Sequence, residues 1–245
     1  MYSPTVGTDS FFTVLAIAAS EQRHIAALDV EGAYLEADMI GDPVHMRLNS
    51  EQANILIEEN ASFKKFQNTD GSVIVQLDKA LYGCIESAKL WYNHLSNILR
   101  GLGYVENPTD PCVFNKTVRN SQLTIIIYVD DVLLTHKDPQ VLIDAQTAIR
   151  REFTAIKTQN GSKLRFLGVD INRSAPGNIF ISMGQYTRGI RPAPYCHRLR
   201  RLLLTLYYQI HLRILPCVQR LNQHCSIPSV LSYYISQLGR ALIYF

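Results

Sequence analysis

The sequence predicts an α+β fold in which an antiparallel sheet is packed on helices. Short apolar, β-rich runs alternate with segments of helical periodicity in the order β-α-β-β-α-β. Two of these runs, Leu123–Val129 and Val132–His136, flank an adjacent pair of aspartates and predict a hairpin with acidic residues at its tip. A third apolar run, His24–Val30, carries another aspartate near its end.

The N-terminal part of the chain is expected to start with a helix over Phe11–Ser20, capped by Asp9 or Ser10. The run His24–Val30 follows as a strand, and Glu31–Ala37 as a turn. The elements expected next, in chain order, are a strand over Val44–Leu48, a helix over Gln52–Phe66, a loop over Asn68–Ser72 and a strand over Val73–Leu77.

The clearest helix of the sequence is Ser87–Leu102, where apolar residues recur every three or four positions and form one stripe. Beyond Tyr186 no clear periodicity is present, so the fold of the C-terminal region is left open. The elements expected between these two segments are a strand over Cys112–Val118, the acidic hairpin, a helix from Pro139 to about Phe153 with Asp138 as its N-cap, and a hairpin formed by Leu164–Ile171 and Ile179–Met183.

The composition excludes several classes of protein. The apolar fraction of 47% is ordinary for a globular chain that buries a core, and the charged fraction is 18%. The apolar stretch Phe11–Ala19 is too short to cross a bilayer, so no membrane association is expected. The five cysteines form no Cys-x-x-Cys pair, which argues against a zinc site or a disulfide framework.

The charges are distributed unevenly along the chain. All 21 acidic residues lie at or before Asp170, where only 15 basic residues accompany them, whereas residues 171–245 hold nine arginines and no carboxylate. We therefore expect a folded core over residues 1–186 and an aberrant basic tail over residues 187–245. The tail is either a basic arm for nucleic acid or a segment translated out of its ancestral frame, and its lack of amphipathic periodicity favours the second.

The aspartate pair is the strongest chemical signal. Asp130 and Asp131 interrupt an otherwise apolar segment, and no lysine or arginine lies nearby in the sequence. Buried carboxylates are costly unless they are paired, protonated or bound to a metal, and Mg²⁺ prefers hard oxygen ligands. The alternative is a solvated turn, in which aspartate is common. Asp29 at the end of its strand has a similar alternative as a capping residue, but three carboxylates together are the set that two Mg²⁺ ions about 4 Å apart can share.

Five segments occur in a fixed order along the chain: DVEGAYLEADM, LDKALYGCIESAKLWYNHL, GYVENPTDPCVF, YVDDVLLT and LRFLGVDI. In this order and spacing the chain resembles copia-type retrotransposon reverse transcriptases over about Tyr2–Tyr186. The resemblance implies a reverse-transcriptase palm with partial fingers. It also implies RNA-directed DNA polymerase activity with two Mg²⁺ ions, Mn²⁺ being the alternative metal.

The resemblance assigns a role to each matching position. Asp29, Asp130 and Asp131 would be catalytic, and together with Val30 they would hold the metal ions. The nucleotide would lie along Val30, Glu31, Gly32, Ala33 and Tyr34, with Tyr34 as the aromatic gate that excludes a 2′-hydroxyl. The primer and template would contact Tyr128 and Val129, the segment Leu81, Tyr82 and Gly83, and the turn at Leu167 and Gly168.

The implied partners are an RNA or DNA template-primer and deoxynucleoside triphosphates, and the other domains of a Pol polyprotein are expected to be missing from this chain. The implied location is a cytoplasmic virus-like particle, with the nucleus as the alternative. The chain departs from many members by reading LYGCIESAK where they read LYGLKQAPR, which puts Glu86 near the expected nucleotide. Two rival hypotheses remain: a catalytically inactive truncated remnant, and a nucleic-acid-binding module that uses the basic tail.

Overall fold

The structure is a computed structural model that describes residues 3–175 and 177–184. The chain divides into two compact units. The hairpin unit consists of Met1–Pro4 and Glu31–Ile98, and the sheet unit consists of Thr5–Val30 and Leu99–Phe245. The predicted basic tail, residues 187–245, lies outside the described residues.

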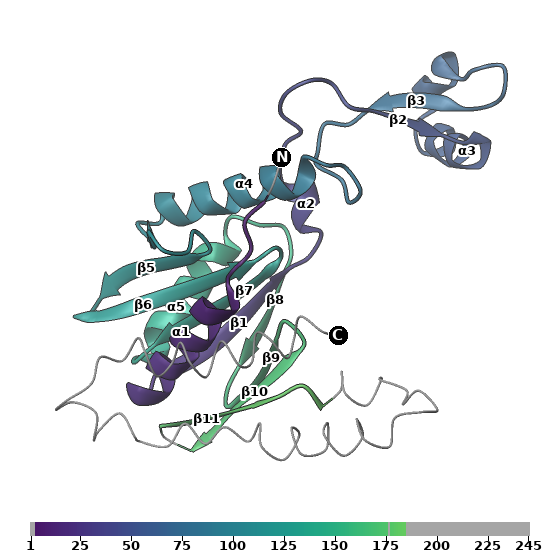
Figure 1. The fold of residues 1–245 in the computed structure, drawn as a ribbon. Coiled ribbons are helices and arrows are strands. Elements are labelled where there is room, and N and C mark those ends of the chain that lie inside the picture. Colours follow the sequence, from purple (N-terminus) through teal and green to yellow (C-terminus); the bar gives the residue numbers. More distant parts are fainter. Residues whose placement is uncertain (1–2, 176, 185–245) are drawn as a thin grey trace, which may run out of the picture. The chain divides into compact units, whose positions relative to one another are not determined.

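A six-stranded sheet in the order β4-β5-β6-β7-β1-β8 forms the centre of the sheet unit, and every neighbouring pair of strands is antiparallel (Figure 1). The strands β6 and β7 form the predicted acidic hairpin, and β1 lies beside β7 although it comes much earlier in the sequence. The strands are β1 (His24–Val30), β4 (Val105–Glu106), β5 (Val113–Val118), β6 (Ser121–Tyr128), β7 (Asp131–His136) and β8 (Ile156–Asn160).

Two helices of the sheet unit, α1 (Thr8–Ser20) and α5 (Pro139–Arg150), lie against this sheet (Figure 1). Helix α5 packs on β1 and β7, and its start is as predicted: the Asp138 side chain accepts a hydrogen bond from the backbone N–H of Gln140, and Pro139 occupies the first turn. The strand pairing shows that the two helices lie on opposite faces of the sheet. The side chain of Gln146 in α5 donates a hydrogen bond to Asn160 of β8, and Asn160 lies on the same face as Ile125 of β6. Helix α1 faces Thr124, the neighbour of Ile125, whose side chain points to the other face.

The core of this unit comes from the apolar runs that predicted the strands. Five consecutive residues of β6, Leu123–Ile127, are buried, as are the five residues of β7 from Val132 to His136. Continuous burial on both faces is what a sheet covered by helices on each side requires, and it explains why these runs do not alternate with polar residues. Phe114 in β5 and Leu28 in β1 are among the largest fully buried side chains.

A second, three-stranded sheet follows α5 in the same unit, in the order β11-β10-β9. Its strands are β9 (Lys163–Phe166), β10 (Val169–Ala175) and β11 (Asn178–Ser182). A two-residue turn at Leu167 and Gly168 joins β9 to β10, and both residues have positive φ (53° and 74°), as a type I′ turn requires. Glycine is the residue that adopts this conformation without strain.

The hairpin unit carries the antiparallel pair formed by β2 (His45–Leu48) and β3 (Val73–Gln76). Asn49 caps the helix that follows β2 by accepting a hydrogen bond from the N–H of Gln52, while the Gln52 side chain accepts one from the N–H of Asn49. The helical segments of this unit are α2 (Ala33–Glu36), α3 (Ser50–Glu59), the 3₁₀ helix η1 (Ala61–Phe66) and α4 (Ser87–Gly101), whose final turn is counted with the sheet unit.

Several predicted boundaries were wrong. The cap of α1 is Gly7 and not Asp9 or Ser10; the Gly7 N–H is bonded to the carboxylate of Asp110, far along the chain. The single helix predicted over 52–66 is interrupted at Asn60, whose side chain accepts from the N–H of Ser62 and starts the 3₁₀ turn. The strand predicted over 164–171 is divided by the turn at 167–168. No helix among the described residues is both long and apolar enough to cross a membrane.

Candidate active site

The pairing of β1 with β7 brings the predicted catalytic aspartates together. Asp29 lies directly opposite Asp131 in the antiparallel register, and the N–H of Val30 donates a hydrogen bond of 3.0 Å to the carbonyl oxygen of Asp130. Directly opposed residues share a face of the sheet, and their Cβ atoms lie about 4.5–5.5 Å apart. The three carboxylates therefore gather where β1 ends and the β6–β7 hairpin turns.

The hairpin turn itself is under strain. Tyr128 pairs with Asp131, so Val129 and Asp130 form a two-residue turn. Val129 has a φ of 54°, in the left-handed region that β-branched residues avoid. Such a conformation costs about 1–3 kcal/mol and persists only where the surroundings enforce it. Here the ladder on one side and the Val30–Asp130 bond on the other hold the turn in place.

The carboxylates repel one another. Burial, and then the neighbouring charges of Asp130 and Asp29, raise the pKa of Asp131 to about 6. Among the described residues, no hydrogen-bonded or ion-paired cation is recorded at Asp131, although Lys157 lies opposite Asp29 on the next strand. A site that accumulates negative charge in this way favours a proton or a bound cation.

The raised pKa of Asp131 predicts how stability depends on pH. The pKa of aspartate in the unfolded chain is about 3.9, so the folded state holds this proton more tightly, and the free energy of unfolding falls as pH rises from about 4 to about 6. Asp131→Asn should therefore stabilise the chain near pH 7 and have little effect near pH 4. Because the side chain is half-buried and partly screened, we expect a gain of about 1 kcal/mol. Thermal unfolding of the parent chain and of Asp131→Asn at the two pH values measures this gain. An equal change in melting temperature at both pH values would contradict a raised pKa of Asp131 in the folded state.

The donor set fits Mg²⁺ in its chemistry. Asp29 near the end of β1, Asp131 at the start of β7 and Asp130 in the turn before it carry carboxylate oxygens, the hard ligands that this ion prefers. Among the described residues, no group of three or more His, Cys, Asp or Glu side chains is arranged closely enough to hold a metal ion by itself. Mg²⁺ is usually bound through one or two carboxylates, with water and substrate phosphates completing its shell, so a closed protein cage is not required.

One residue of this face was missed by sequence reasoning. Lys157 of β8 lies directly opposite Asp29 on the side away from Asp131, and its side chain is exposed. Asp29 is thus flanked on the same face by a carboxylate and an ammonium group. The sequence gives no strand signal here, because β8, with the sequence IKTQN, is short and polar. No strand was therefore predicted at these positions.

The other predicted residues of the sheet unit lie on its turns. Tyr128 is the last residue of β6 and Val129 the first residue of the β6–β7 turn, while Leu167 and Gly168 form the β9–β10 turn. Val30 ends β1 and is 1% exposed, so it can serve the predicted nucleotide or metal site only through its main chain.

The remaining predicted residues belong to the hairpin unit, where two separate predicted sets meet. The short helix α2 begins with Ala33 and Tyr34. Its N-cap is Gly32, which has a φ of 65°, and Glu31 precedes the cap. The ring of Tyr34 stacks on that of Tyr82, with centroids 4.1 Å apart and an angle of 25° between the planes.

Tyr82 belongs to the predicted template segment Leu81, Tyr82 and Gly83, and a buried serine holds this segment. The Ser87 hydroxyl accepts a hydrogen bond of 3.0 Å from the N–H of Leu81 and donates one of 2.7 Å to its carbonyl oxygen. Tyr82 is 53% exposed, so part of its surface stays accessible beside Tyr34.

Comparison with known proteins finds one family model and several transposon polyproteins that are similar to this chain. The sequence model of the family described as "Reverse transcriptase (RNA-dependent DNA polymerase)" matches residues 1–191. The Retrovirus-related Pol polyprotein from transposon RE1 of Arabidopsis thaliana is 27% identical over 186 residues, which are 76% of this chain and 12% of that protein. The corresponding polyprotein from transposon TNT 1-94 of Nicotiana tabacum is 25% identical over 188 residues, 76% of this chain and 13% of that protein.

A third relative comes from yeast. The truncated transposon Ty1-A Gag-Pol polyprotein of Saccharomyces cerevisiae is 29% identical over 178 residues, which cover 70% of this chain and 12% of that protein. The chain thus spans about an eighth of the length of these curated relatives.

Proposed function

The chain belongs to the reverse transcriptase (RNA-dependent DNA polymerase) family, as its motifs predict, and on that premise we propose that it carries the nucleotidyl-transfer site of a retrotransposon polymerase. The proposed reaction joins the 3′-hydroxyl of a primer to the α-phosphate of a deoxynucleoside triphosphate and releases pyrophosphate. The observation that carries the proposal is the register that sets Asp29 opposite Asp131, next to Asp130 at the hairpin turn.

The carboxylates would act as ligands in this reaction. Asp29 and Asp130, with Asp131 beside them, would hold two Mg²⁺ ions together with the phosphates of the nucleotide. When bound, Mg²⁺ supplies Lewis-acid activation of the primer hydroxyl and offsets the charge on the pyrophosphate leaving group. The chain's own contribution is orientation, since a ladder of hydrogen bonds on each side of β1 fixes the position of Asp29.

Primer extension by the purified chain tests the proposal. The chain is incubated with an RNA template, a DNA primer, deoxynucleotides and Mg²⁺, beside an Asp130→Asn variant whose fold is checked by circular dichroism. Extension by the parent that disappears in the variant supports the polymerase. Extension retained by the variant would overturn the metal assignment. No extension by either folded protein would favour the inactive remnant.

Tyr34 is proposed to select deoxyribonucleotides. Its ring is fixed by stacking on Tyr82, and a rigid aromatic surface of this kind can reject a sugar that bears an additional hydroxyl. Tyr34→Val should therefore raise the use of ribonucleotides relative to deoxyribonucleotides by on the order of tenfold or more. The measurement is the ratio of kcat/KM for the two substrates. Tyr104→Phe is the control, since Tyr104 is buried in the sheet unit, and an unchanged ratio in Tyr34→Val would contradict the role.

Lys157 is proposed to contact a phosphate of the nucleotide or of the primer, because it is an exposed lysine that lies directly opposite Asp29 on the next strand. Removal of one phosphate contact should weaken substrate binding about threefold to tenfold and reduce the slope of log affinity against log salt by about 1. Lys157→Gln is compared with Lys163→Gln, an exposed lysine on β9. Binding of a fluorescent template-primer across a salt series measures the slope, and identical slopes in the two variants would contradict the contact.

A further inference from the structure

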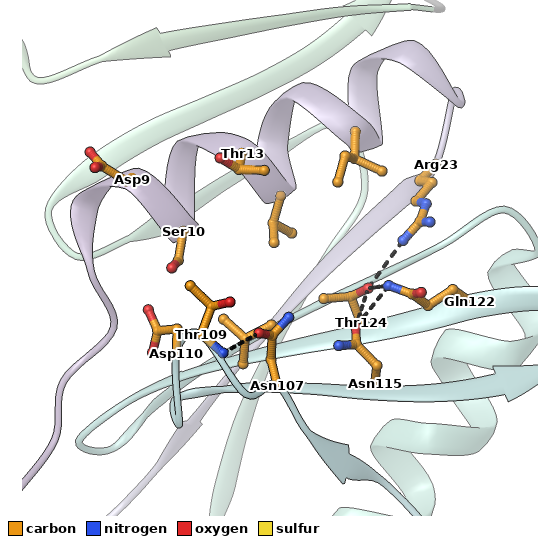
Figure 2. Close-up of a pocket in the computed structure, with 13 residues that line it drawn as sticks. Asp9, Ser10, Thr13, Arg23, Asn107, Thr109, Asp110, Asn115, Gln122 and Thr124 are labelled. Carbon is orange, nitrogen blue, oxygen red and sulfur yellow. Dashed lines mark hydrogen bonds between the residues drawn. The ribbon is translucent and has the colours of Figure 1, made fainter. Parts of the chain in front are cut away.

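A pocket of about 330 Å³ lies between helix α1 and the sheet (Figure 2), and none of Asp29, Asp130 and Asp131 is among the residues that line it. Its walls are apolar where Val14 and Ile17 of α1 face Val113 of β5, and polar at both ends. Pockets of about 300–1,000 Å³ with apolar walls and a few converging polar groups are typical of small-molecule sites. None of the roles proposed above uses this space.

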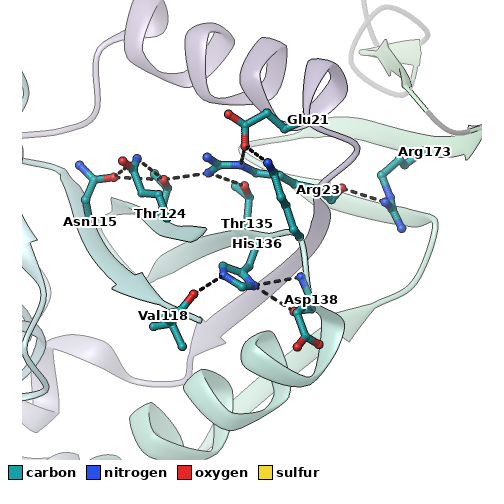
Figure 3. Close-up of polar contacts among 11 residues, drawn as sticks. Glu21, Arg23, Asn115, Val118, Thr124, Thr135, His136, Asp138 and Arg173 are labelled. Atoms are coloured by element: carbon teal, nitrogen blue, oxygen red, sulfur yellow. Dashed lines mark hydrogen bonds and ion pairs between the residues drawn. The ribbon is translucent and has the colours of Figure 1, made fainter. Parts of the chain in front are cut away.

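A buried arginine closes one end of the pocket. Arg23 is 4% exposed, and its Nε donates a hydrogen bond of 3.1 Å to Oε2 of Glu21, while its Nη1 lies 3.2 Å from the hydroxyl of Thr124 and 3.5 Å from that of Thr135 (Figure 3). Arginine is almost never buried unless its charge is paired. Among the described residues, none accepts a hydrogen bond from Nη2 of Arg23. This nitrogen is not among the fully buried atoms that lack a partner, and Arg23 lines the pocket.

An amide group adds a second donor at the same end. Oδ1 of Asn115 accepts hydrogen bonds from the hydroxyl of Thr124 and from Nε2 of Gln122, at 3.0 and 2.8 Å. These bonds fix the orientation of the Asn115 amide and leave its Nδ2 without an acceptor among the described residues. Two fixed donors, one of them cationic, therefore line this end of the pocket, next to its apolar walls.

The surrounding charges favour an anion at this end. Glu21 is shared between Arg23 and Lys137, whose Nζ lies 3.3 Å from Oε2 of Glu21, so two cations face one carboxylate. Arg173 adds a third cation by donating a hydrogen bond of 2.8 Å to the carbonyl oxygen of Arg23. The opposite end of the pocket carries the carboxylates of Asp9 and Asp110, which would repel a ligand of high negative charge.

We propose that this pocket binds a small monocarboxylate with a short apolar body. The carboxylate would accept hydrogen bonds from Nη2 of Arg23 and Nδ2 of Asn115, and the apolar part would lie between Val14, Ile17 and Val113. Thr124 lines the pocket and pairs with Thr135 of β7. These threonines are four residues along β6 and β7 from Tyr128 and Asp131, on the same face of the sheet, and four residues of a strand span about 13 Å. The pocket is therefore distinct from the carboxylate site.

Saturation-transfer NMR with the full chain tests the proposal, with benzoate as the probe and benzamide as its neutral match at constant ionic strength. We expect millimolar binding of benzoate and at least tenfold weaker binding of benzamide. Thr13→Trp, on the exposed rim of the pocket, should abolish the benzoate signal, whereas Thr8→Trp, an exposed residue of the same helix that does not line the pocket, should not. Arg23→Gln should lower benzoate affinity to that of benzamide.

Three outcomes would overturn the proposal: equal binding of benzoate and benzamide, retention of binding by Thr13→Trp, and no benzoate binding at millimolar concentrations. If Arg23→Gln fails to fold, the comparison of benzoate with benzamide and the variants Thr13→Trp and Thr8→Trp still test the proposal. Asp130→Asn should bind benzoate like the parent chain, so the outcome is independent of whether the chain extends a primer.

Discussion

Asp29→Asn should reduce primer extension by about a thousandfold or more while leaving the fold intact, because removal of one ligand of a metal-assisted transfer removes charge stabilisation from the transition state. The amide keeps the size of the carboxylate, and the main-chain ladder from β1 to β7 and β8 is unaffected. Single-turnover extension measures the chemical step, and circular dichroism measures the fold.

The matched control for this experiment is Asp42→Asn, which makes the same chemical change at an exposed loop residue of the hairpin unit. It should extend primers like the parent chain. If Asp29→Asn retains more than about a tenth of the parent rate, a loss of only about 1.4 kcal/mol, Asp29 is not a ligand in the transition state. The opposition of Asp29 and Asp131 would then be a structural pairing only.

Phe114→Ala should lower the free energy of unfolding by about 3–5 kcal/mol, the usual cost of deleting a fully buried aromatic side chain. Phe114 is 0% exposed and lies in β5, where it pairs with Ile125 of the acidic hairpin. The loss combines the transfer of apolar surface to water with the cavity that remains. Urea unfolding followed by circular dichroism measures the change through the shift of the midpoint.

Phe66→Ala is the comparison, because Phe66 is 56% exposed at the end of η1. It contacts the ring of Phe63 and the ammonium group of Lys65, and these contacts are worth under about 1 kcal/mol at an exposed site. A cost at Phe114 no larger than that at Phe66 would mean that the β5–β6 region is not part of the cooperative core.

The main elements of the sheet unit could be predicted because their signals are local. His24–Val30 was predicted as a strand with the bounds that the structure has, and the acidic hairpin was predicted from two apolar runs around an aspartate pair. Asp138 followed by Pro139 is a helix start that depends on neighbouring residues alone. In each case the pattern and the physical cause occupy the same few positions.

The missed features depend on residues far apart in the sequence. The N-cap of α1 is Gly7, whose N–H donates a hydrogen bond to the carboxylate of Asp110, and no spacing rule connects these positions. The strand β8 is stabilised by its pairing with β1 and not by its own apolar content, so Lys157 could not be placed beside Asp29. The stacking of Tyr34 on Tyr82 likewise brings together two motifs that the sequence treats separately.

The position of the Asp29 side chain also depends on the register between β1 and β7. A slip of one residue between β1 and β7 would turn the Asp29 side chain to the opposite face, toward helix α5, and would place Leu28 on the face of the carboxylates. The burial of β1, which is interrupted at Asp29, therefore fixes the site as well as the core, and polar substitutions at Leu28 would disturb both.

The sheet order has a further consequence for biosynthesis. The strand β1 is made early, but both of its neighbours, β7 and β8, come after residue 130. At about 5–20 residues per second, a ribosome needs on the order of ten seconds to supply them, and during that interval β1 has two unsatisfied edges. A nascent chain that stops before β7 would thus expose an apolar strand that readily pairs with other chains. Molecular chaperones that bind extended apolar segments would be expected to associate with this stage of translation.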